Sequence, residues 1–250
     1  MRLFHLLQNT PCTALDSFEV SLTKKGLKRV LGLATHQKSP ITPALLLQFK
    51  SHLDLTTPAD AAIWCLFTVA FFSFLRKSNL TVSSPSSFDP TRHLCRDDIK
   101  FTSHGAVLRI KWTKTLQHKD RLLLVPLPRI PGSALCPVSA IVQYFTLVPA
   151  PDSAPFFSIP SHGSLRPLTH DVFSKAIKSH ISSLGLSPSD FSPHSFRRGG
   201  ATFAFQAGVP ERLIQRHGDW RSDAYRRYLS LSLTQRTVVA DLMAAGLMVS

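Results

Sequence analysis

Residues 192–229 read SPHSFRRGGATFAFQAGVPERLIQRHGDWRSDAYRRYL, and this stretch decides how the whole chain is interpreted. Ser192 followed by proline predicts the start of a helix, because the serine hydroxyl can cap free N–H groups and proline has no N–H to leave unsatisfied. Gly208 and Gly218 each end a short helical segment, as glycine commonly does after the last helical turn. The sequence therefore predicts three short helices in succession.

Side chains with useful chemistry are spread along these three helices. His194 and Arg197 lie three residues apart and so share one face of the first helix. Ser222 can cap the third helix, which carries Tyr225 and Tyr228. The stretch holds seven arginines, no lysine and three acidic residues. A histidine, an arginine and a tyrosine fixed on arginine-rich helices indicate chemistry directed at a phosphodiester.

The composition of the whole chain favours a folded, basic protein with a polyanionic partner. Its 250 residues are 44% hydrophobic and include 17 phenylalanines, which is enough for one large domain or for a domain and a fragment. The formal net charge is +14, so nucleic acid is the first candidate for the partner. A merely soluble basic protein is the alternative, because net charge does not specify a fold.

Other classes of protein are disfavoured by the cysteines and the apolar runs. The four cysteines have neither a C-x-x-C pairing nor the spacing of metal ligands, which indicates a reducing compartment without disulfides. The longest apolar run, residues 61–75, is too short to span a bilayer, and the first residues lack a signal-peptide core and cleavage site. We expect no metal, no other cofactor and no role in a membrane.

The C-terminal stretch resembles the catalytic box of the tyrosine recombinases, also called the phage-integrase family. The family pattern is His-x-x-Arg, then a His or Trp beside a glycine, then a nucleophilic tyrosine; HSFR at 194–197, HGDW at 217–220 and SDAYRRY at 222–228 carry it here. The segment WRSDAYRRYL most resembles sequences of the eukaryotic branch of the family, which is carried by DIRS-like, Ngaro-like and Crypton mobile elements. The resemblance implies the tyrosine recombinase catalytic-domain fold, mainly α-helical with a small antiparallel β-sheet (α+β).

The resemblance also divides the chain into two parts. Residues 1–38, with a basic amphipathic piece at 21–31, would be the remnant of an N-terminal core-binding domain, the helical half of a DNA clamp. A solvated helix with a basic face is the alternative for this piece. Residues 39–250 would form the tyrosine recombinase catalytic domain.

A nearly all-apolar helix should lie at the centre of the catalytic domain. Thr57 and Pro58 begin it with a capping box, and apolar side chains follow almost without interruption until Arg76. An arginine at the end of a core helix is fixed in position, which suits a phosphate ligand. By resemblance Arg76 is the first catalytic arginine; the family usually braces it with an acid three residues later, where this chain has Asn79.

Two β-strands of a hairpin are predicted at 106–112 and 121–126. The family carries its catalytic lysine on such a hairpin, where Lys114 fits best and Lys111 and Lys119 are the fallbacks. Lysines that merely lie on an exposed hairpin are the alternative. We also expect helices at 43–53, 137–145 and 171–183, a proline-rich linker at 149–160, and a final amphipathic helix at 233–247.

The resemblance assigns a role to each candidate residue. Arg76 and Arg197 would hold the non-bridging oxygens of the phosphate, each with a planar fork of donors. His194 would support the phosphate and shuttle a proton, as its near-neutral pKa permits. Lys114 would protonate the leaving 5′ oxygen, and Tyr228 would be the nucleophile.

Tyr228 is one of only three tyrosines in the chain. It is preferred because the interval between Ser222 and Tyr228 matches the spacing in the family between a small hydroxyl residue and the nucleophile. Tyr225, three residues earlier, is the alternate, and would otherwise be a packing residue or a contact to the DNA backbone. Tyr144 lies beside apolar residues in another predicted helix, so we expect it in the core.

Trp220 and His217 compete for the third position of the family pattern. Neither directly follows the glycine, where the family has its His or Trp; that place is taken by Asp219. Trp220 is favoured because an indole N–H can donate to a phosphate as an imidazole does.

These residues together imply a site-specific DNA recombinase or integrase from a mobile element. It would break one strand of double-stranded DNA through a 3′-phosphotyrosyl bond, rejoin it to another 5′ hydroxyl, and associate with other copies of itself on the DNA. We expect it in the nucleus if its source is eukaryotic and otherwise in the cytoplasm or nucleoid, and we do not expect it to be secreted. The alternatives are a catalytically inactive DNA-binding remnant of such an element, and an enzyme like the type IB topoisomerases, which relaxes supercoils by the same chemistry.

Overall fold

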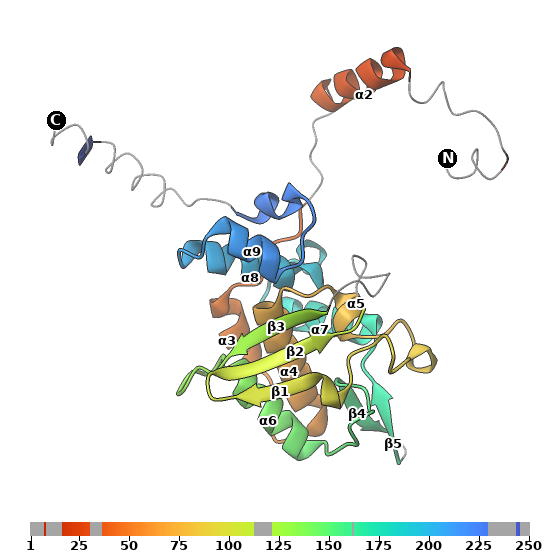
Figure 1. The fold of residues 1–250 in the computed structure, drawn as a ribbon, viewed down its shortest axis with the longest axis vertical. Coiled ribbons are helices and arrows are strands. Elements are labelled where there is room, and N and C mark those ends of the chain that lie inside the picture. Colours follow the sequence, from red (N-terminus) through yellow and green to blue (C-terminus); the bar gives the residue numbers. More distant parts are fainter. Residues whose placement is uncertain are drawn as a thin grey trace. The chain divides into compact units, whose positions relative to one another are not determined.

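The computed structural model describes Gln8 and residues 17–30, 37–112, 122–161, 163–229 and 244–245. It divides the chain into two compact units, residues 1–37 and 38–250. In the first unit the described part is mainly helix α2 (Phe18–Val30), which contains most of the basic piece predicted at 21–31 (Figure 1). That this unit is the remnant of a core-binding domain stays a prediction.

The described part of the second unit is mainly helical and holds two small antiparallel sheets (Figure 1). Its α-helices are α3 (Pro43–Ser51), α4 (Pro58–Ser73), α5 (Lys77–Leu80), α6 (Pro137–Leu147), α7 (His170–Ser183), α8 (His194–Gln206) and α9 (Glu211–His217). Its strands are β1 (Ile99–Thr102), β2 (Gly105–Ile110), β3 (Leu123–Pro128), β4 (Ser158–Ser161) and β5 (Ser164–Pro167). Short 3₁₀ helices are η2 (Pro85–Ser87), η3 (Arg96–Asp98), η4 (Pro188–Asp190) and η5 (Asp223–Tyr228).

Helix α4 is the centre of the core, as its apolar sequence predicts. It begins after Thr57, whose hydroxyl accepts a hydrogen bond from the backbone N–H of Asp60, and most of its side chains are buried. It packs against α6, α8 and strand β3 (Figure 1). The helix ends because Phe74 adopts a left-handed conformation with φ of 52°, which turns the chain just before Arg76.

The main sheet has the strand order β1-β2-β3, with antiparallel pairs throughout. The predicted hairpin is confirmed as β2 and β3, in which Leu108 is paired with Val125 and Ile110 with Leu123. Side chains of β3 alternate between buried and exposed, so one face of the strand covers α4. Two prolines are tolerated in β3 because it is an edge strand of this sheet.

The segment predicted as a proline-rich linker at 149–160 is instead part of the fold. It leads into β4, which pairs with β5, and its Phe156 and Phe157 are buried in the core. Its backbone is bonded to the chain before β1, since Phe156 donates its N–H to the carbonyl of Leu94 at 2.9 Å. Buried aromatic pairs therefore determine the structure of this segment more than its prolines do.

The other predicted helices are confirmed where the structure describes them. Helices α3, α6 and α7 begin after Thr42, Cys136 and Thr169, whose side chains accept the capping hydrogen bonds. Most of the helix predicted at 233–247 lies outside the described residues. In the part of the chain that is described, no helix has the length and apolar character that crossing a bilayer requires.

Helix α8 approaches its neighbours closely because Gly199 and Gly200 have no side chains. A Cβ atom on Gly199 would lie 1.8 Å from the carbonyl oxygen of Ile41, and one on Gly200 would lie 2.1 Å from that of Phe71. The glycine pair thus permits the close approach of two other backbone segments. It allows α8 to pack beside the end of α4.

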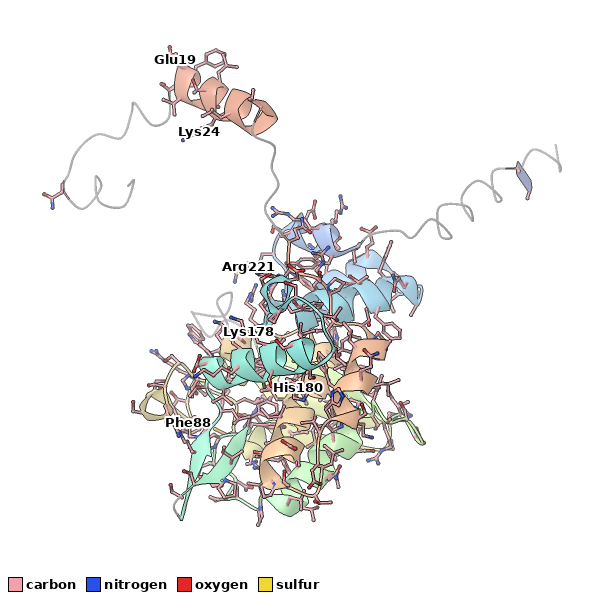
Figure 2. All side chains as sticks on the ribbon, turned by 180° about the vertical axis from the view of Figure 1, so that it is seen from behind. Glu19, Lys24, Phe88, Lys178, His180 and Arg221 are labelled. Atoms are coloured by element: carbon pink, nitrogen blue, oxygen red, sulfur yellow. The ribbon has the colours of Figure 1, made fainter. Side chains whose placement is uncertain are left out.

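Aromatic rings fill the core beneath this contact. Phe67 of α4 packs against Phe196 of α8 and Phe173 of α7, with ring centroids 5.0 and 6.1 Å away, and these two rings also contact each other at 5.5 Å. His180, which Figure 2 labels on α7, has its ring centroid 5.6 Å from that of Phe67, in an edge-on arrangement. Such tilted aromatic packing gives the helices a defined relative position, on which the geometry of the site depends.

Candidate active site

Segments that are distant in the sequence meet at one end of α4. Arg76 follows this helix, and it lines a pocket together with His194 and Arg197 from the first turn of α8. The chain after α9 reaches the same place, where Trp220 packs on Arg197 and Tyr228 contacts His194. The structure therefore brings together these five of the six predicted catalytic residues. The pocket is completed by Leu75, Lys77, Ser78, Ser192 and Pro193.

The start of α8 differs in detail from its prediction. The helix begins at His194 with Pro193 at the N-cap, and no side chain caps it. Instead of capping the helix, Ser192 donates its backbone N–H to the hydroxyl of Ser195 at 3.1 Å. Ser222 likewise precedes η5 without a side-chain cap, and the predicted third helix is this short 3₁₀ helix.

Arg197 is a buried arginine held by backbone carbonyls. Only 2% of the residue is exposed. Its Nη2 donates to the carbonyl of Gly218 at 2.7 Å, and its Nη1 donates to the carbonyl of Phe74. Its Cζ lies 3.7 Å from the centroid of the Trp220 ring. Because a guanidinium has five N–H groups, these two bonds leave donors for a ligand in the pocket.

Two unusual backbone turns form this arrangement. Among the described residues, Phe74 and Asp219 are the only ones other than glycine with a positive φ, 52° in each case. Phe74 presents its own carbonyl to Arg197, and Asp219 directly follows Gly218, which provides the second carbonyl. Left-handed residues other than glycine cost about 1–3 kcal/mol and persist where the surroundings impose them. Both of them border the site.

The pKa of Arg197 reflects its surroundings. Burial and the nearby charge of Arg76 lower this pKa to about 9, while Tyr228 and Asp219 act in the opposite direction. The guanidinium therefore stays protonated at neutral pH. Because it is removed from water, its charge acts more strongly on an anion in the pocket than an exposed charge would.

Tyr228 contacts His194 directly. Its Oη lies 2.6 Å from Nε2 of His194, and the two rings are edge-on with centroids 5.4 Å apart. Desolvation by the surrounding protein lowers the pKa of His194, and the charges of Arg197 and Arg76 lower it further. A neutral imidazole can accept the phenol proton at Nε2. The geometry thus pairs the phenol of Tyr228 with a group that can accept its proton.

The other candidate nucleophile, Tyr225, lies in a small core. Only 3% of it is exposed, and it belongs to a cluster of buried side chains with Phe74 and Ile214. Its ring also packs on Trp220 with a centroid distance of 6.0 Å. Tyr228 is only half-buried, and its hydroxyl lies against a residue that lines the pocket. The structure therefore favours Tyr228 over Tyr225.

The sequence did not indicate how Tyr228 is held in place. Thr202 of α8 donates its hydroxyl hydrogen to the carbonyl of Tyr228 at 2.6 Å. A threonine inside a helix commonly bonds a carbonyl of its own helix, so no sequence signal marks this contact. The sequence also gave no sign that the carbonyls of Phe74 and Gly218 hold Arg197, because backbone acceptors leave no trace in side-chain patterns.

Trp220 and His217 have different surroundings. His217 donates a ring N–H from Nε2 to the carbonyl of Phe72 at 2.8 Å, and it lines an apolar groove with Phe203 and Leu213. Trp220 instead covers Arg197. The glycine before Asp219 allows this position, because a Cβ atom there would lie 1.7 Å from the indole ring. The geometry therefore favours Trp220 as the residue that acts on the pocket.

Asn79 ties the turn that carries Arg76 to the sheet. Its Oδ1 accepts a hydrogen bond from the backbone N–H of Arg76 at 3.3 Å, and its Nδ2 donates to the carbonyl of Trp112 at 3.1 Å. An amide can do both at once, whereas the acid expected here from the family pattern could only accept. The departure from that pattern thus has a structural counterpart in the bond to Trp112.

Lys114 and its fallback Lys119 lie in 113–121, outside the described residues. Lys111 is described, and its Nζ lies 2.6 Å from Oδ2 of Asp98 and donates to the carbonyl of Pro90. Although desolvation opposes the shift, the bond to Asp98 raises the pKa of Lys111. A lysine held in this way is a poor proton donor, which favours the other two candidates.

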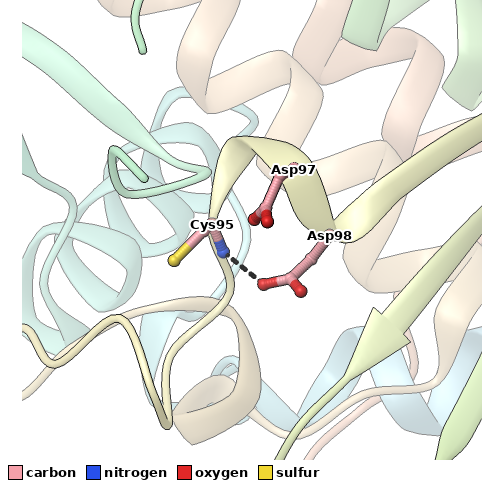
Figure 3. Close-up of side chains that lie close together, drawn as sticks. All are labelled: Cys95, Asp97 and Asp98. Carbon is pink, nitrogen blue, oxygen red and sulfur yellow. Dashed lines mark hydrogen bonds between the residues drawn. The ribbon is translucent and has the colours of Figure 1, made fainter. Parts of the chain in front are cut away.

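One group of possible metal ligands occurs in the described part of the chain: Cys95, Asp97 and Asp98 (Figure 3). The Asp98 carboxylate already accepts hydrogen bonds from the backbone N–H of Cys95 at 2.8 Å and from Arg109 at 3.0 Å, besides its ion pair with Lys111. Protein cations therefore neutralise this carboxylate, and the group is a structural ion-pair cluster.

No protein-family model and no curated protein matches the sequence. Solved structures do match. XerH site-specific recombinase, bound to its palindromic difH substrate in a post-cleavage complex, is 18% identical with a TM-score of 0.58 over 83% of this chain and 54% of its own. The Tn1549 transposon integrase in complex with transposon right-end DNA is 17% identical with a TM-score of 0.55, over 87% and 70% of the two chains.

A third structure, XerA recombinase, is 16% identical with a TM-score of 0.53. The match covers 84% of this chain and 65% of XerA. The chain thus spans about half the length of XerH recombinase, 54%. These likenesses show the fold, which is the catalytic-domain fold of the tyrosine recombinases. The fold class predicted from the sequence is confirmed.

Proposed function

We propose that this chain is the catalytic part of a site-specific DNA recombinase or integrase. The observation that carries the proposal is the pair formed by Tyr228 and His194, with Oη and Nε2 2.6 Å apart, at a pocket lined by Arg76 and Arg197. A phenol beside a neutral base and two guanidinium groups is suited to nucleophilic attack on a phosphodiester. The fold supports the proposal, because its solved neighbours are recombinases and integrases.

In the proposed reaction each residue has one task. Arg76 and Arg197 bind the non-bridging oxygens of the phosphate and stabilise the charge that grows there. The oxygen of Tyr228 attacks phosphorus while its proton passes to Nε2 of His194. The bond from phosphorus to the 5′ oxygen breaks, and Lys114 gives that oxygen a proton. The products are a 3′-phosphotyrosyl bond and a free 5′ hydroxyl, and attack by a 5′ hydroxyl rejoins the strand.

Double-stranded DNA is the proposed substrate, and other copies of the chain are the proposed partners. The net charge of +14 supports a polyanionic substrate. XerH recombinase and the Tn1549 integrase have been solved with DNA, and lambda integrase as a dimer bound to a core site. An origin in a DIRS-like, Ngaro-like or Crypton element, and with it a nuclear location, is part of the proposal and rests on WRSDAYRRYL at 220–229.

The test is capture of a covalent protein–DNA adduct. The protein is incubated with a pool of duplexes that carry random sequence around a position close to a nick, so that the short strand released by cleavage diffuses away and rejoining is prevented. Denaturing electrophoresis should show an adduct with the natural chain and with Tyr225→Phe, and none with Tyr228→Phe. Both substitutions keep the ring and remove one oxygen, so a difference between them reports the nucleophile.

The other outcomes separate the alternatives. Loss of the adduct in Tyr225→Phe alone would move the nucleophile to that residue. DNA binding without an adduct from the natural chain, also when the chain is extended at its N-terminus, would indicate an inactive DNA-binding remnant. Relaxation of supercoiled plasmid without any recombinant product would indicate an enzyme like the type IB topoisomerases.

A further inference from the structure

Two hydrogen bonds join Tyr228 to α8, one at its phenol oxygen and one at its backbone carbonyl. Its phenol oxygen lies 2.6 Å from His194, in the first turn of this helix. Its backbone carbonyl accepts a hydrogen bond of 2.6 Å from Thr202, eight residues further along the same helix. Eight residues correspond to slightly more than two helical turns. One rigid element therefore carries the base and also holds the backbone of the residue that the base would activate.

The bond from Thr202 has a clear physical reason. Tyr228 is the last residue of η5, and the last carbonyls of a helix have no partner within that helix. A 3₁₀ helix is also held by poorer hydrogen bonds than an α-helix, so η5 has little stiffness of its own. Thr202 is half-buried and its hydroxyl is directed to another element, not back along α8. The contact thus fixes the end of a short helix that would otherwise be weakly held.

We propose that Thr202 is a positioning residue for the nucleophile: its hydroxyl holds the backbone of Tyr228 so that the phenol oxygen stays beside His194. The inference rests on the proposed function, because it gives Tyr228 the role of nucleophile.

The test compares variants of Thr202 in single-turnover adduct formation on the nicked duplex pool. Thr202→Val keeps the shape and removes the hydroxyl, and Thr202→Ser keeps the hydroxyl. The rate at saturating DNA should fall by about tenfold to a hundredfold in Thr202→Val, because misplacing a reacting group by about 1 Å can cost a hundredfold in rate. Thr202→Ser should restore most of the rate. The DNA concentration that gives half-saturation should stay the same in both.

The matched control is Thr68→Val. Thr68 is a fully buried threonine of α4 whose hydroxyl bonds carbonyls of its own helix, at Trp64 and Cys65. Its replacement perturbs the fold at least as much but should leave the rate of adduct formation unchanged. If Thr202→Val does not fold, as judged by thermal unfolding, Thr202→Ala takes its place, because alanine is a good helix former and adds no volume.

The remaining outcomes are distinct from one another. A natural rate in Thr202→Val, or equal losses in Thr202→Val and Thr202→Ser, would overturn the role of the hydroxyl while the proposed function stands. A natural chain that forms no adduct at all would overturn both the proposed function and this inference.

Discussion

The indole ring of Trp220 covers the guanidinium group of Arg197, with Cζ of the arginine 3.7 Å from the ring centroid. The same ring packs on Tyr228, with centroids 5.9 Å apart. A planar cation over an aromatic face is attracted by the ring, and it also loses water on that side. Trp220 therefore connects the candidate nucleophile to the buried cation, and it has a part in orienting both.

Replacement of Trp220 should separate this covering role from a direct role as a donor to phosphate. Trp220→Ala should lower the rate of adduct formation by about tenfold or more, because a cation–π contact of roughly 1–2 kcal/mol is lost together with packing. Trp220→Phe keeps a ring over Arg197 but has no N–H, so it should retain most of the rate. The measurement is single-turnover adduct formation. Equal damage in Trp220→Phe and Trp220→Ala, with recovery in Trp220→His, would instead assign the indole N–H to the phosphate.

The close approach of α8 should make Gly199 intolerant of any side chain. A Cβ atom there would lie 1.8 Å from a backbone carbonyl oxygen of Ile41, which cannot move aside as a flexible side chain could. Gly199→Ala should therefore lower the free energy of unfolding by about 1–3 kcal/mol or more, as overpacking does. Urea unfolding measures the change. Gly26→Ala is the control, because nothing lies within 4 Å of a Cβ at Gly26, and it should not destabilise the protein.

The parts of the site that could be predicted are those with a local signal. The capping pair at Thr57 and Pro58 and the apolar run after it predict α4, and the end of that run locates Arg76. The spacing of His194 and Arg197 places both in one helical turn, and the structure confirms this. These features depend on residues close in sequence, for which helix geometry alone is sufficient.

The parts that could not be predicted depend on contacts between distant elements. The left-handed conformations of Phe74 and Asp219 bring carbonyls to Arg197, yet neither residue type signals such a turn. The proline-rich segment before β4 is ordered by buried phenylalanines rather than by its local sequence. The choice between Trp220 and His217 also depended on which ring the fold turns toward Arg197, because both lie next to or near the same glycine.

The rate of adduct formation should depend on pH through His194. Desolvation, followed by the charges of Arg197, Arg76 and Arg198, lowers the pKa of this histidine from its ordinary value of 6.5. Only the neutral imidazole can take the proton of Tyr228. The rate should therefore be constant from pH 6.5 up to the region of the Arg197 pKa, about 9, and on the acid side it should fall only below pH 6.5, through the lowered pKa of His194.

A change in the surrounding charge should move that transition in a known direction. Arg198 contributes to the shift but does not line the pocket, so Arg198→Gln should move the midpoint of the acid limb upward, toward 6.5. Arg212→Gln is the control, since Arg212 is not among the causes of the shift. The free energy of unfolding should depend on pH in the same direction as the rate. As the pH falls, His194 takes up a proton at a higher pH in the unfolded chain than in the folded one, so its contribution to stability is lost between pH 6.5 and the lower folded pKa. Single-turnover rates and urea unfolding across this pH range test both statements, and a midpoint above 6.5 for the natural chain would show that His194 is not the base.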